Sequence, residues 1–156
     1  MGLFREYDLR GIVGKELTAD IAERVGRAYC THVRKRGAKT ITVGRDGRLS
    51  SPDLYRALVK GLLAGGLNVI DIGICPSPLV YFSLHTLPVD GGIMITGSHN
   101  AAEYNGFKIC VGKEAIHGEE IQELRRVMEQ GQFVSGQGTL TEHPIIPDYL
   151  AYIKKS

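Results

Sequence analysis

The sequence contains no tryptophan and has few of the features that mark specialised classes of protein. Its three cysteines, Cys30, Cys75 and Cys110, are widely spaced and include no C-x-x-C pair, so neither a zinc site of that kind nor a redox dithiol is indicated. We expect three buried free thiols in a reducing compartment. No apolar run approaches the roughly 18 residues of a membrane span, and no signal peptide precedes the first element. These absences predict a cytoplasmic protein.

Charge is nearly balanced, with a formal net charge of +2 over 156 residues. Basic residues are scattered apart from Arg34-Lys35-Arg36, which stands at an expected helix end where cations offset the helix dipole. The basic stripe with interleaved aromatics that is typical of nucleic-acid binding is lacking. We therefore expect no nucleic-acid and no membrane partner. A 43% hydrophobic content at this length predicts one globular domain.

Helical and strand patterns alternate along most of the chain. Thr18 is a good N-cap, and Ser51 with Pro52 is a good helix start. The expected helices occupy residues 18–37, 51–65 and 76–87 and a segment around 121–127, with strands at 39–45, 68–73, 91–96 and 106–111. The last strand follows its predecessor with no helix between, which indicates an antiparallel pair. The pattern predicts a three-layer α/β/α fold with a mixed, mostly parallel sheet.

The two ends of the chain give weaker patterns. Residues 4–11, "FREYDLRG", suggest a polar turn with an anchoring aromatic. After Gly131 the Gly- and Ser-rich composition is typical of a connector, and "PDYLAYIKKS" begins as a helix that is cut short. We therefore divide the chain into a domain at residues 1–140 and, at residues 141–156, a connector with the start of a further helix.

The loop Thr96-Gly97-Ser98-His99-Asn100 follows a strand, where ligand-binding loops gather in such sheets. It could be a polar turn, or it could present the Ser98 hydroxyl for chemistry. A serine hydrolase is disfavoured, because adjacent Ser98 and His99 point in different directions and no G-x-S-x-G elbow or acidic third member is present. We expect Asp46 and Arg48 of "GRDGRLSS" to fix their loop. No His, Cys or carboxylate cluster has metal-ligand spacing.

Four motifs, "FREYDLRG", "GRDGRLSS", "TGSHN" and "EYNGFKI", stand in this order between residues 4 and 109. Together they resemble the first domain of the α-D-phosphohexomutase family, in its bacterial phosphomannomutase/phosphoglucomutase branch. The resemblance implies a four-domain enzyme that interconverts hexose 1-phosphate and hexose 6-phosphate through a bisphosphorylated sugar. It also implies that Ser98 carries the transferred phosphate, that Lys108 assists proton transfer, and that Arg10 lies against the phosphate.

The resemblance also implies the surroundings of Ser98. Tyr7, His99 and Asn100 match substrate-binding positions in the same cleft. The phosphoserine at Ser98 would be one ligand of Mg²⁺, whose other ligands belong to a second domain, and glucose 1,6-bisphosphate would be the activator. The partners implied are the hexose phosphate and domains 2–4 of the same polypeptide, so we expect the isolated chain to be nearly inactive.

One departure from the family pattern lies in the loop itself. The family usually has proline after Asn100, whereas Ala101 follows here, which removes a restraint on φ. Two other interpretations stay open: a phosphoglucosamine mutase domain, and a non-catalytic module that binds a sugar phosphate or a partner protein. The residues that choose between mannose, glucose and glucosamine would lie outside this chain.

Overall fold

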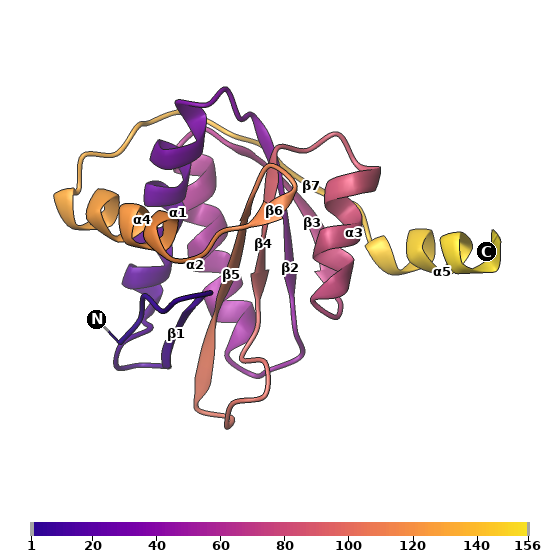
Figure 1. The fold of residues 1–156 in the computed structure, drawn as a ribbon, viewed down its shortest axis with the longest axis horizontal. Coiled ribbons are helices and arrows are strands. Elements are labelled where there is room, and N and C mark those ends of the chain that lie inside the picture. Colours follow the sequence, from indigo (N-terminus) through magenta and orange to yellow (C-terminus); the bar gives the residue numbers. More distant parts are fainter. Residues whose placement is uncertain (1, 156) are drawn as a thin grey trace.

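Seven strands and five helices alternate along residues 2–155, which are the residues described by the structure, a computed structural model (Figure 1). In chain order they are β1 (Leu9–Ile12), α1 (Ala19–Arg34), β2 (Thr40–Arg45), α2 (Ser51–Ala64), β3 (Asn68–Ile74), α3 (Pro78–Thr86), β4 (Gly91–Ile95), β5 (Tyr104–Val111), β6 (Glu114–Ala115), α4 (Glu119–Gln130), β7 (Leu140–Glu142) and α5 (Ile145–Lys155).

The strands form one mixed sheet in the order β1-β5-β4-β2-β3-β7, with β6 paired to β5. Strands β4, β2, β3 and β7 are parallel neighbours, whereas β5 is antiparallel to β1, β4 and β6. Among the described strands, β5 is therefore the one that is antiparallel to all the others. The mostly parallel sheet is confirmed, as is the direct return from β4 to β5 through the loop at residues 96–103.

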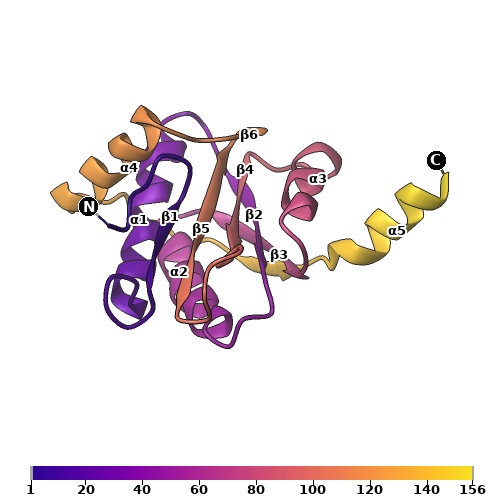
Figure 2. The same cartoon turned by 60° about the horizontal axis from the view of Figure 1, so that its bottom comes forward.

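Helices cover both faces of the sheet, which confirms the three-layer architecture. Helices α1 and α2 lie on one face with α4 against α1, and α3 lies on the other with α5 beside it (Figures 1 and 2). Side chains such as Tyr29, Leu58 and Phe107 fill the larger core under α1 and α2. A smaller core under α3 includes Leu79 and Met94.

The helix boundaries follow the local signals in the sequence. Thr18 caps α1, where its hydroxyl oxygen accepts a hydrogen bond from the Ile21 backbone N–H at 3.2 Å. Pro52 lies in the first turn of α2, where a missing N–H costs nothing. Gly66, just past the end of that helix, has a φ of 95°, a conformation that glycine adopts without steric cost.

The sequence interpretation was wrong at two places, where short strands form. Residues 9–12 are strand β1 rather than part of a polar turn, and Leu9 pairs with Phe107, almost a hundred residues away. Phe4 is buried as the expected anchor, whereas Tyr7 is 72% exposed. Residues 140–142 are strand β7, paired with β3, although a connector was expected to start at residue 141. The sheet therefore extends to residue 142. Composition did not reveal β7, because it is an exposed edge strand whose position is set by main-chain pairing.

The composition also gave expectations about the cysteines and about membrane spans, and both concern residues 2–155. Cys30, Cys75 and Cys110 are buried and free, as expected. In that range, none of the helices combines the length and the apolar character that crossing a membrane would take.

Helices α1 and α2 approach each other closely because glycines face each other at their contact. A Cβ added to Gly61 of α2 would lie 2.1 Å from the backbone oxygen of Glu23, and one on Gly26 of α1 would lie 2.6 Å from that of Leu58. Backbone atoms cannot move aside as the end of a side chain can. The helix pair therefore depends on these two glycines.

We expect Gly61→Ala to lower the free energy of unfolding by about 1–3 kcal/mol, the usual cost of overpacking a core. This cost opposes the gain of about 1 kcal/mol that alanine normally brings to a helix interior. Urea denaturation measures the change. Gly47→Ala is the control, because a Cβ there meets no atom within 4 Å. Equal stability of the two variants would contradict the close contact.

Candidate active site

The loop between β4 and β5 holds Ser98 in an unusual backbone conformation. Ser98 has a φ of 54°, and no other non-glycine residue from 2 to 155 has a positive φ. Its backbone N–H donates to the hydroxyl oxygen of Thr96 at 2.9 Å, and the Asn100 N–H donates to the Gly97 carbonyl at 3.0 Å. A non-glycine residue in this region typically costs about 1–3 kcal/mol and persists where surrounding contacts fix it. The side chain of Ser98 is left exposed at the turn.

Arg48 supplies those surrounding contacts. Its Nη2 donates to the carbonyl oxygens of Ser98 at 3.1 Å and Asn100 at 2.7 Å, and its Nη1 donates to those of Ala101 at 2.7 Å and Tyr104 at 3.1 Å. One planar guanidinium thus binds three carbonyls of the loop and that of Tyr104, the first residue of β5. This contact holds the loop where the family pattern has proline and this chain has Ala101.

Asp46 also holds the loop, because it contacts both Arg48 and the loop residue Gly97. Its carboxylate lies 3.4 Å from Arg48 Nε and accepts hydrogen bonds from the Gly97 N–H at 3.0 Å and the Ser51 hydroxyl at 2.6 Å. Burial raises the pKa of Asp46, but the hydrogen bonds from Ser51, Arg48 and Gly97 outweigh it, so the net pKa lies below the ordinary value. Asp46 and Arg48 have the loop-fixing role expected, and they extend it to the loop of Ser98.

A cavity of about 340 Å³ opens beside Ser98, within the range of small-ligand pockets. It is lined by Tyr7, Asp8, Arg10, Tyr81, Ser98, Lys108, Ala115, Ile116 and His117. Four of the six residues expected at the site therefore share one cavity: Ser98, Lys108, Arg10 and Tyr7. Asn100 joins them through its side-chain oxygen, which accepts a hydrogen bond from Arg10 Nη1 at 3.0 Å. His99 is exposed and is not among the lining residues.

The sheet register brings Arg10 and Lys108 to the same face. Arg10 on β1 lies opposite Gly106 on β5, and Lys108 is two residues further along β5. Side chains two apart on a strand point to the same side. Gly106 leaves room for this pairing, since a Cβ there would lie 2.1 Å from the Leu9 carbonyl oxygen.

The charges of the cavity favour an anion. The Arg10 guanidinium contacts the Asp8 carboxylate at 3.1 and 3.3 Å, so these two charges offset each other. Lys108 has no ion-pair partner among residues 2–155, and it leaves the cavity with an uncompensated positive charge. Burial raises the pKa of the nearby Cys110 thiol to about 11, which keeps that thiol neutral. A phosphate group would supply the missing negative charge.

The described residues do not by themselves fit a magnesium site. Within residues 2–155 there is no group of three or more His, Cys, Asp or Glu side chains placed to hold a metal ion. Mg²⁺ requires near-octahedral oxygen coordination, and Ser98 would provide one oxygen through a phosphate.

Four lining residues lie outside the four sequence motifs, and two of them, Tyr81 and His117, have polar side chains. Tyr81 comes from α3, and His117 follows β6 on the way to α4. Neither position follows from spacing, because each residue reaches the cavity from an element that carries none of the motifs. A histidine just before a helix start was the one signal in the sequence.

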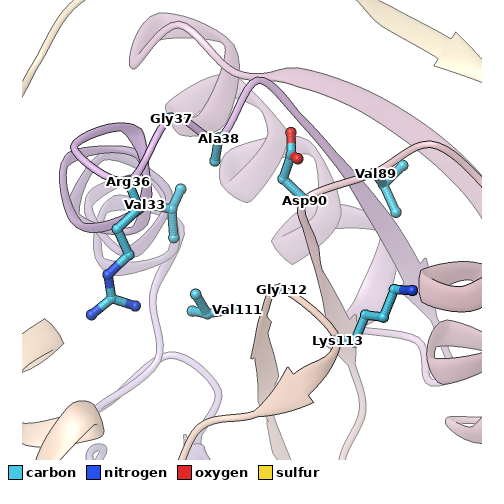
Figure 3. A pocket seen from close by; sticks show the side chains of 9 residues that line it. All are labelled: Val33, Arg36, Gly37, Ala38, Val89, Asp90, Val111, Gly112 and Lys113. Atoms are coloured by element: carbon cyan, nitrogen blue, oxygen red, sulfur yellow. The ribbon is translucent and has the colours of Figure 1, made fainter.

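A second hollow of about 370 Å³ lies at the other end of the strands (Figure 3). Its lining includes Ala38, which precedes β2, Asp90, which precedes β4, and Lys113, which follows β5. The Asp90 carboxylate accepts hydrogen bonds from the backbone N–H groups of Lys39 at 2.8 Å and Thr40 at 3.1 Å. Asp90 therefore has a structural partner, and none of the expected site residues lines this hollow.

The fold and the site define an α/β/α domain that presents a serine, on a clamped loop, to a cavity suited to an anion. Comparison with known proteins gives the family. The family described as "Phosphoglucomutase/phosphomannomutase, alpha/beta/alpha domain I" matches residues 1–135. The chain belongs to this phosphoglucomutase/phosphomannomutase family, of which it is domain I.

Individual relatives agree with this assignment. The chain is 43% identical over 152 residues to the phosphomannomutase/phosphoglucomutase of Pseudomonas aeruginosa, covering 97% of this chain and 33% of that protein. It is 41% identical over 153 residues to the phosphoglucomutase of Neisseria meningitidis serogroup B, with the same two coverages. A crystal structure of a phosphoglucomutase/phosphomannomutase family protein from Burkholderia thailandensis matches with a TM-score of 0.95 and 39% identity, over 99% of this chain and 36% of that one. The chain thus spans about a third of the length of these relatives.

Arg48→Lys should loosen the loop, because a lysine ammonium cannot contact four carbonyls in one plane. We expect amide hydrogen exchange of residues 97–101 to become at least about tenfold faster, as local opening grows easier. Arg56→Lys is the matched control, since Arg56 is an exposed helix residue paired with Asp53. Unchanged exchange in Arg48→Lys would show that the loop is held by other contacts.

The loop should also weaken in acid through Asp46. Because its folded pKa is lowered, the ionised carboxylate stabilises the fold above the unfolded value of about 4, and this stabilisation is lost as the pH falls through the folded pKa. Asp46→Asn should be less stable than the unmodified chain at pH 7, and the difference should narrow below about pH 4. Urea midpoints measured from pH 7 to pH 2.5 give the comparison. A constant difference over that range would argue against the assigned role of Asp46.

Proposed function

We propose that this chain is the phosphoserine-bearing domain of a phosphohexomutase that interconverts hexose 1-phosphate and hexose 6-phosphate, with mannose or glucose as the sugar. The observation that carries the proposal is the shared cavity: Ser98 lies on a clamped loop beside the unpaired Lys108 and the fixed Arg10. Family membership and the names of the relatives support it.

The proposed chemistry is phosphoryl transfer from Ser98. A sugar hydroxyl oxygen forms a bond to phosphorus as the bond from phosphorus to Ser98 Oγ breaks, and the hydroxyl proton passes to Ser98 Oγ. Lys108 assists that proton transfer, while Arg10 lies against the phosphate. This gives a sugar bisphosphate, whose other phosphate returns to Ser98 after the sugar reorients. Positioning and charge stabilisation supply most of the rate enhancement in such reactions.

Other parts of the proposal concern groups beyond this chain. We take Tyr7, Asn100 and His99 as substrate-binding residues, with His99 acting on the loop rather than inside the cavity. Mg²⁺ would take one ligand from phosphorylated Ser98 and the rest from further domains of the same polypeptide, and glucose 1,6-bisphosphate would load the serine. The reaction would take place in the cytoplasm.

The direct test uses a chimera in which this chain replaces the matching third of the Pseudomonas aeruginosa relative. We expect the chimera to accept one phosphoryl group from glucose 1,6-bisphosphate and to convert glucose 1-phosphate, and Ser98→Ala to lose about a thousandfold or more in kcat. Lys108→Met should lose about a hundredfold. Lys113→Met, an exposed lysine of the second hollow, is the matched control. An active Ser98→Ala chimera would overturn the proposed function.

The isolated chain should be a poor enzyme even when it is folded. It lacks the further groups that would clamp the substrate, and electrostatic stabilisation is the largest contribution in such sites. We expect its mutase activity to lie at least about a thousandfold below that of the chimera under the same conditions. Comparable activity would show that the described cavity is complete without other domains.

A further inference from the structure

His117 reaches the cavity of Ser98 from a segment that none of the four motifs includes. It follows β6 and precedes α4, the hairpin and helix that come after β5 (Figure 1). Two contacts fasten this segment to the N-terminal strand region. The Gly118 N–H donates to the Glu6 carbonyl at 2.7 Å, and the rings of Tyr7 and His117 lie with centroids 6.2 Å apart. The Gly118 hydrogen bond therefore places the backbone of this segment beside the cavity, and the exposed ring of His117 lies next to that of Tyr7.

The ring nitrogens of His117 have no hydrogen-bond or ion-pair partner among the described residues. His117 nevertheless lines the same cavity as Ser98 and Lys108. The histidine that does have such a task is His32, whose Nε2 lies 2.8 Å from a Glu120 oxygen. An imidazole with free nitrogens can donate a hydrogen bond to a ligand.

The charged side chains that line the cavity provide less positive charge than a phosphoserine carries negative charge. Toward the cavity, His117 shares the lining with the charged groups Asp8, Arg10 and Lys108 and with the phenols of Tyr7 and Tyr81. Asp8 and Arg10 offset each other, so Lys108 provides one net positive charge. A phosphoserine carries about 1.5 to 2 negative charges at neutral pH. Between about half and one of these negative charges then has no partner among the described lining residues.

On its outer side His117 faces the groups that line an adjoining hollow, which are Arg36, Glu114, Glu119 and Glu120. Two of these acids already have cationic partners. Glu120 contacts Arg36 at 2.8 Å as well as His32, and Glu119 contacts Arg126 at 2.6 Å. Glu114 has no ion-pair partner among residues 2–155, and the Glu6 carboxylate lies beside Gly118, but no ion pair joins any of these acids to His117 in that range.

We propose that His117 is a phosphoryl-contacting residue, which donates a hydrogen bond from its imidazole to the phosphate carried on Ser98. This inference rests on the proposed function, since it takes the phosphoserine as the ligand. It adds to Lys108 and Arg10 a third hydrogen-bond donor, which comes from a segment outside the four motifs.

In the test, phosphoserine is incorporated at position 98 of the 156-residue chain by genetic encoding. The phosphate is then present without any mutase activity. The protonated fraction of His117 at pH 7 is read from its ring nitrogen chemical shifts. We expect this fraction to rise about threefold when Ser98 becomes phosphoserine, as a neighbouring opposite charge favours the charged form. Phosphoserine at the exposed Ser135, which lines neither hollow, is the matched control and should leave His117 unchanged.

Two outcomes overturn the inference: an unchanged His117 with phosphoserine at 98, or an equal change with phosphoserine at 135. The ring of His143, paired with Asp148 at 2.6 Å on a different element, serves as an internal reference. In the chimera, His117→Ala should lower kcat/KM at pH 6.5 by about tenfold, the usual value of one charge-assisted hydrogen bond, and His117→Lys should restore most of it. A chimera that never phosphorylates Ser98 would instead refute the proposed function, while the encoded phosphoserine still tests the contact.

Discussion

The contact of the Arg48 guanidinium with three carbonyls of one loop and with that of Tyr104 is the interaction on which the site depends. The loop puts Ser98 in a backbone conformation that a serine does not adopt without support. Asp46 fixes Arg48 and also binds the Gly97 N–H, so both partners are tied to the same turn. The motif "GRDGRLSS" therefore acts on the neighbouring motif "TGSHN", and the two are parts of one unit.

The reversed strand β5 explains where the cavity lies. Because β5 runs against its neighbours, the chain returns along the sheet directly after the loop and brings Lys108 back beneath Ser98. Strand β1 then adds Arg10 on the same face. The cavity thus collects residues from the N-terminal region and from the middle of the chain, and the pairing of the buried Leu9 and Phe107 holds these together.

Sequence patterns predicted most of the fold, because helices such as α1 carry their caps and apolar periodicity within one continuous segment. They missed β1 and β7, which are three or four residues long and are placed by pairing with distant strands, and they also missed the two-residue β6. At the site, resemblance to a family placed Ser98, Lys108 and Arg10 together. It could not place His117, whose position depends on how the segment before α4 packs against the N-terminal region.

The proposed function depends above all on whether Ser98 carries a phosphoryl group. Phosphopeptide mapping of the protein, purified from its own cells, gives the answer. We expect phosphate on the peptide that contains Ser98, and its removal when hexose 1-phosphate is added. An unmodified Ser98 that stays unmodified after incubation with glucose 1,6-bisphosphate and magnesium would contradict it.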